Sequence, residues 1–141
     1  MIWKHQPTLE GMNAMSARTL NEALGIEFTE IGPDYMKARM PVDARTVQPF
    51  RILHGGASGA LAETLGSVAS VMCVEDPTKE ACVGIELNCS HLKSAPEGTF
   101  VTGTVRPFRI GRKIQVWNIE IQDEKGALVC VSRLTIAVVQ R

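Results

Sequence analysis

Residues 57–74 constrain this chain most, because they form a helical pattern without an ordinary solvent-facing side. At 100° per residue, one side carries the apolar stripe that packs on a sheet: Ala57, Leu61, Leu65, Val68 and Met72. Where lysines and glutamates would face water, the opposite side carries small residues: Gly56, Gly59, Gly66, Ser67 and Ser70. Glu63 is the only charged residue of the segment. We therefore expect a helix that is covered on both sides.

Three interpretations of this segment are open. A membrane-spanning helix needs about 20 strongly apolar residues, and Glu63 with the glycines and serines disfavours it. A plain core helix would bury a carboxylate without a stated partner, which is costly. In the third interpretation, which we favour, the small residues let another backbone or a ligand approach, and Glu63 serves as a sheltered general base or nucleophile.

The sequence His54-Gly55-Gly56 lies where this helix should begin. Backbone N–H groups at a helix start lack intrahelical partners and carry the positive end of the helix dipole. Gly55 is therefore a candidate donor to a substrate carbonyl, although the glycines could also serve only a tight turn. Gly55 and Glu63 are eight positions apart, or roughly 12 Å along the axis. If both act on one carbonyl, two antiparallel helices of a dimer must supply them.

The remaining pattern predicts an α+β fold in a single domain, residues 1–141. Residues 8–23 are expected to form one or two short helices, with Leu9, Met12, Met15 and Leu20 buried. Residues 26–42 alternate around Gly32-Pro33-Asp34 and predict a β-hairpin. Four more strands are expected over residues 81–92, 99–108, 113–122 and 128–139, joined by tight turns and hence antiparallel.

The composition limits the binding partners, the cellular compartment and the metal sites that we expect for this chain. Fifteen basic and 15 acidic residues give zero net charge, which disfavours a nucleic-acid partner. The four cysteines show no paired spacing, so we expect buried thiols in a reducing compartment. The N-terminus turns polar too early for a signal peptide, which predicts a cytoplasmic protein with no membrane segment. The three histidines lie far apart, which disfavours a metal site.

Two further features are ambiguous. A basic run where two strands turn (Arg106, Arg109, Arg112 and Lys113) suits a phosphate, with Gly111 giving backbone access, or is an ordinary solvated turn. His91 ends the alternating series Val83, Ile85, Leu87, Cys89, so it should point to the apolar side of its strand, either as a core or interface histidine or as a ligand contact. The sequence Gly56-Ala57-Ser58-Gly59-Ala60 approximates the GxSxG elbow of serine hydrolases, but the βαβ order that this motif requires is missing.

A family resemblance connects these features. The segments Gln48-Pro49-Phe50, Leu53-His54-Gly55-Gly56-Ala57 and Leu61-Ala62-Glu63-Thr64-Leu65-Gly66-Ser67 together resemble the signature of hotdog-fold acyl-CoA thioesterases. The chain is most similar to the bacterial branch that contains the dihydroxynaphthoyl-CoA hydrolases of menaquinone synthesis and the proofreading thioesterases of enterobactin synthesis. This resemblance implies an antiparallel sheet wrapped around one long central helix. It also implies a homodimer or homotetramer with active sites at the dimer interface.

The resemblance also implies residue roles. Glu63 would be the catalytic carboxylate, Gly55 would polarise the thioester carbonyl, His54 would shape that site, and Gln48 would position the carbonyl or the water. Ser67 would border the acyl pocket, and His91, Gly111 and Arg112 would line the CoA channel.

The implied reaction is hydrolysis of an aromatic or medium acyl-CoA without metal or cofactor. A carrier-protein thioester as substrate, and a non-catalytic acyl-CoA-binding domain, are the alternatives. Arg51 departs from the family pattern, because relatives usually carry glycine at this position.

Overall fold

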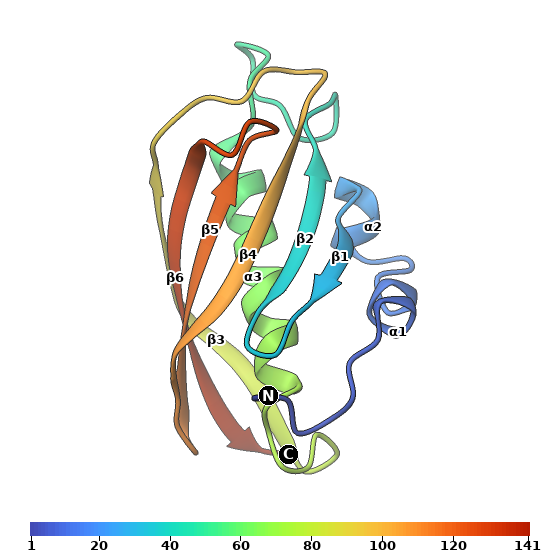
Figure 1. Ribbon diagram of the computed structural model, residues 1–141, viewed down its shortest axis with the longest axis vertical. Helices are drawn as coiled ribbons and strands as arrows, with labels where there is room; N and C mark the ends of the chain where they lie inside the picture. Colours follow the sequence, from blue (N-terminus) through green and yellow to red (C-terminus); the bar gives the residue numbers. More distant parts are fainter.

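The computed structural model describes residues 1–141 and contains one six-stranded antiparallel sheet that wraps around one long helix (Figure 1). The strand order is β1-β2-β4-β5-β6-β3. The strands are β1 (Glu27–Ile31), β2 (Met36–Pro41), β3 (Glu80–His91), β4 (Phe100–Ile110), β5 (Ile114–Gln122) and β6 (Leu128–Gln140). The helices are α1 (Leu9–Ala14), α2 (Leu20–Leu24) and α3 (Gly55–Val71). The α+β class and the order of the elements that the sequence predicted are confirmed.

The central helix α3 begins two residues earlier and ends three residues earlier than predicted. Ala57, Leu61 and Leu65 are buried as expected, but Val68 and Met72 are only half-buried. Gly66 and Ser70, which we placed on the side opposite the sheet, are buried by this chain itself. A Cβ on Gly66 would collide with Leu134 of β6, so this glycine allows close packing of helix on sheet. The sheet curls around α3, and this curl widens the buried side beyond one stripe.

The two strand edges of the sheet differ. At the β1 edge, the Asn13 side chain of α1 accepts a hydrogen bond from the Phe28 N–H (2.8 Å) and donates one to the Phe28 carbonyl (3.1 Å). At the other edge, β3 pairs only with β6 and leaves its outer side open.

The predicted burial of the N-terminal helices is largely wrong, because Met12 is buried while Leu9, Met15 and Leu20 are exposed.

Strand β3 contains a bulge between Gly84 and Glu86 that changes which side chains face α3. Cys82 packs on the core and Gly84 lies against α3, whereas Val83 (46% exposed) and Ile85 (58% exposed) face outward. The predicted alternation is therefore wrong for Val83 and Ile85. Beyond the bulge, Leu87 and Cys89 lie beside Gly59 of α3, as predicted.

All four cysteines are free thiols. Burial raises the pKa of Cys73 to about 11 and also raises the pKa of Cys130. No helix of the structure has the length and apolar character that crossing a membrane requires.

Candidate active site

The start of α3 leaves one backbone donor uncommitted. His54 is the N-cap, and its Nδ1 accepts a hydrogen bond from the Gly56 N–H (2.8 Å). Helical bonding begins with the N–H groups of Ala57 and Ser58, which donate to the His54 carbonyl at 3.0 and 3.3 Å. The Gly55 N–H has no acceptor within the chain. His54 thus fixes the helix start while Gly55 keeps a donor available for a ligand.

A cavity of about 370 Å³ opens at this end of α3. Its wall includes Gln48, Gly55, Ser58 and His91, together with Leu92 and Lys93 from the loop after β3. The ring of His91 lies over Gly55, since a Cβ on Gly55 would lie 2.9 Å from His91 Nε2. The structure therefore brings three of the predicted site residues, Gln48, Gly55 and His91, to one cavity.

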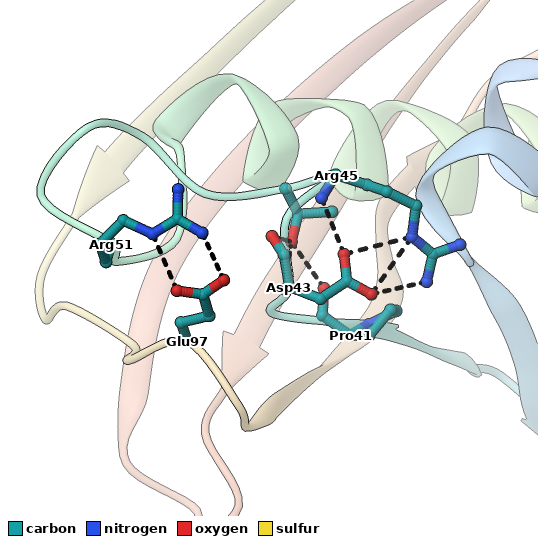
Figure 2. A network of polar contacts seen from close by, with 6 residues as sticks. Pro41, Asp43, Arg45, Arg51 and Glu97 are labelled. Atoms are coloured by element: carbon teal, nitrogen blue, oxygen red, sulfur yellow. Dashed lines mark hydrogen bonds and ion pairs between the residues drawn. The ribbon is translucent and has the colours of Figure 1, made fainter.

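The loop that carries Gln48 is held in a tight turn. The Gln48 N–H donates to the Ile52 carbonyl (2.9 Å), and the Arg51 N–H donates to the Gln48 carbonyl (2.8 Å). Arg51 adopts a φ of 63°, the left-handed region that favours glycine. Its guanidinium forms a two-pronged ion pair with Glu97, with Nε 2.9 Å from Oε2 (Figure 2). The unusual arginine therefore ties the Gln48 loop to the loop before β4.

Glu63 lies two turns further along α3, outside this cavity. Its side chain is half-buried, and its carboxylate lies against the α-carbon of Gly84 in β3. No hydrogen bond or ion pair within the chain involves this carboxylate. Ser67, one turn further, is also half-buried.

Gly111 and Arg112 lie at the opposite end of the molecule from Gly55. They line a separate cavity of about 260 Å³ with Lys4, Glu75 and Glu80, close to where α3 ends. Figure 1 shows the turn between β4 and β5 at the lower end and the start of α3 at the upper end. The predicted basic cluster is divided, because Arg106 lies over the Tyr35 ring at 5.1 Å. Of the remaining cations, Arg112 lines this cavity, which also contains the carboxylates of Glu75 and Glu80.

One chain thus places the predicted site residues in three groups: Gln48, His54, Gly55 and His91; then Glu63 and Ser67; then Gly111 and Arg112. Two more residues border these groups without having been assigned to the site from sequence: Ser58 lines the cavity, and Gly84 lies against Glu63. Ser58 carried a usable signal, since it follows Gly55 by three positions and therefore shares its helix face. Gly84 carried none, because its role depends on the bulge in β3.

Comparison with known proteins identifies the family. Residues 50–130 match the thioesterase superfamily. The 1,4-dihydroxy-2-naphthoyl-CoA hydrolase of Escherichia coli is 52% identical over 138 residues, which cover 98% of this chain and 99% of the relative. The proofreading thioesterase EntH of Cronobacter turicensis is 51% identical over 138 residues, covering 98% of each chain. A crystal structure of a thioesterase from Haemophilus influenzae has a TM-score of 0.94 and 46% identity, covering 99% of this chain and 96% of that one. This protein belongs to the thioesterase superfamily and is a thioester hydrolase with the hotdog fold.

Proposed function

We propose that this protein hydrolyses acyl-CoA thioesters with an aromatic or medium acyl group, releasing the free acid and CoA. The observation that carries the proposal is the uncommitted Gly55 N–H, which opens into a cavity bordered by Gln48 and His91. A donor at this position can stabilise the negative charge that develops on a thioester carbonyl oxygen. The named activity of the Escherichia coli relative supports a CoA ester as substrate.

Glu63 is the proposed catalytic carboxylate. It removes a proton from water as the water attacks the thioester carbonyl carbon, or it attacks that carbon itself to give an anhydride that water then hydrolyses. The carbonyl oxygen becomes an oxyanion beside the Gly55 N–H, and collapse of this intermediate breaks the carbon–sulfur bond. CoA leaves as a thiolate and takes up a proton. Gln48 orients the carbonyl or the water.

The proposed site is completed across a dimer, since Gly55 and Glu63 are roughly 12 Å apart along one helix. The open β3 edge, with exposed Val83 and Ile85, is the surface we propose for this pairing. Antiparallel pairing about a two-fold axis between positions 87 and 88 would place Gly84 opposite His91 of the partner subunit. Because Glu63 lies against Gly84 and Gly55 lies under His91, this register brings Glu63 toward Gly55 of the partner subunit.

A thiol-release assay with a panel of aroyl-CoA and acyl-CoA esters tests the function. We expect turnover by the wild-type protein and a loss of nearly all turnover in Glu63→Ala with the assembly intact. Turnover like that of the wild type in Glu63→Ala would refute the mechanism.

A carrier-protein thioester is the second candidate substrate, favoured by the similarity to a proofreading thioesterase. Parallel assays with the same acyl group on free CoA and on a carrier protein distinguish the two substrates. Binding of CoA esters without any turnover would instead indicate a non-catalytic binding protein.

A further inference from the structure

Ser58 is a buried hydroxyl that the mechanism above does not use. Its side chain is 1% exposed, yet it lines the cavity that contains Gln48 and Gly55. No protein group hydrogen-bonds its hydroxyl, which borders the cavity. The hydroxyl is therefore available to donate a hydrogen bond to a ligand in this cavity.

The helix geometry directs this hydroxyl toward Gly55. Side chains of an α-helix tilt toward its N-terminus, so Ser58 covers the turn that begins three residues earlier at Gly55. The Gly55 N–H and the Ser58 hydroxyl therefore lie at the same end of one cavity. Gly55 lacks a side chain that could separate them.

We infer that Ser58 donates a second hydrogen bond to the thioester carbonyl oxygen, beside the Gly55 N–H. This inference rests on the proposed thioesterase function and adds a catalytic residue to it. Two donors hold the oxyanion better than one, because the tetrahedral oxygen carries a full charge and several lone pairs.

A nucleophilic role for Ser58 does not fit the structure. A serine nucleophile needs a base within hydrogen-bonding reach, and its hydroxyl bonds to no side chain. His91 borders the same cavity but makes no hydrogen bond to Ser58. The hydroxyl therefore acts as a donor and forms no covalent intermediate.

The test compares Ser58→Ala with Ser70→Ala, a matched control on the same helix. Ser70 is also fully buried and its hydroxyl also lacks a partner, but it does not line this cavity. With a CoA ester that the wild-type protein hydrolyses, we expect Ser58→Ala to lower kcat about 100-fold with little change in KM. Ser70→Ala should stay within about twofold of the wild type, since it removes no donor from the site.

Vibrational spectroscopy of the bound thioester shows whether Ser58 donates a hydrogen bond to its carbonyl or only contributes to packing. With an aroyl-CoA bound to Glu63→Gln, the carbonyl stretching frequency should rise when Ser58→Ala is added. If Ser58→Ala does not fold, Ser58→Cys keeps the shape with a weaker donor and should show the same losses in smaller measure. Unchanged kcat, or a rise in KM alone, would overturn the inference. Failure of the wild-type protein to hydrolyse any thioester would instead overturn the proposed function.

Discussion

The carboxylate of Glu63 in α3 lies directly against the α-carbon of Gly84 in β3, leaving no room for a Cβ at position 84. Gly84→Ala should therefore displace the carboxylate. Because a displacement of about 1 Å at a reacting group can cost about 100-fold in rate, we expect a 10- to 100-fold fall in kcat. Thiol release under saturating substrate measures this loss, and circular dichroism checks the fold.

A double variant shows whether this loss passes through Glu63. If Gly84→Ala acts by moving the carboxylate, adding it to Glu63→Gln should cost no further activity. Additive losses would indicate a different cause, such as a disturbed β3 edge.

Mixing two inactive variants tests the shared site. In a two-fold dimer, a mixed pair of Glu63→Ala and Gln48→Ala subunits keeps one site with both residues intact. After denaturation and refolding of an equal mixture, we expect about a quarter of wild-type activity, because about half of the dimers are mixed and each has one working site. Each variant refolded alone is the control. No recovery in the mixture would contradict a site built from two chains.

Two glycines of α3 should respond to alanine with opposite signs. A Cβ on Gly66 collides with Leu134, and overpacking a core costs about 1–3 kcal/mol. A Cβ on Gly59 would instead make ordinary contacts with Leu87 and Cys89, at 3.7 and 3.9 Å. Gly59→Ala should then gain roughly 0.5–1 kcal/mol from better helix propensity. Urea unfolding measures both, and a stable Gly66→Ala protein would contradict the packing described above.

The left-handed backbone at Arg51 predicts an order of stability among its variants. Arg51→Gly and Arg51→Ala both lose the ion pair to Glu97, but only glycine removes the strain of a φ of 63°. We expect the glycine variant to exceed the alanine variant by about 1 kcal/mol in unfolding free energy. Equal stabilities would mean that position 51 carries no backbone strain.

Asp123 predicts part of the acid sensitivity. Hydrogen bonds from Lys93 and from the backbone N–H groups of Ala127 and Lys125 hold the pKa of this carboxyl below its usual value. The folded state therefore binds this proton less readily than the unfolded state, and the stabilisation is lost as pH falls through the folded-state pKa. Asp123→Asn should flatten the fall in unfolding free energy below about pH 4. Urea unfolding at a series of pH values measures this dependence. If the unfolding free energy of Asp123→Asn falls with pH as steeply as that of the wild type, Asp123 makes no such contribution.

Local pattern predicted most of the fold. The strands lie within about two residues of their predicted ends, because alternation and turn residues act over short distances. Residues 57–74 identified the central helix and its single carboxylate for the same reason. Gly66 and Ser70 were assigned to the wrong side of the helix, because the amount of helix surface that a curled sheet covers depends on several strands at once.

The sequence by itself determined which chemical groups this protein carries: a helix start at His54-Gly55-Gly56, and one carboxylate two turns later, roughly 12 Å along the axis. Only the tertiary structure decided which of them meet. His91 comes from β3, far from Gly55 in the chain, the loop that carries Gln48 folds back beside the start of α3, and the bulge in β3 sets Gly84 against Glu63. Such contacts depend on register and loop closure between distant segments, which no local periodicity encodes.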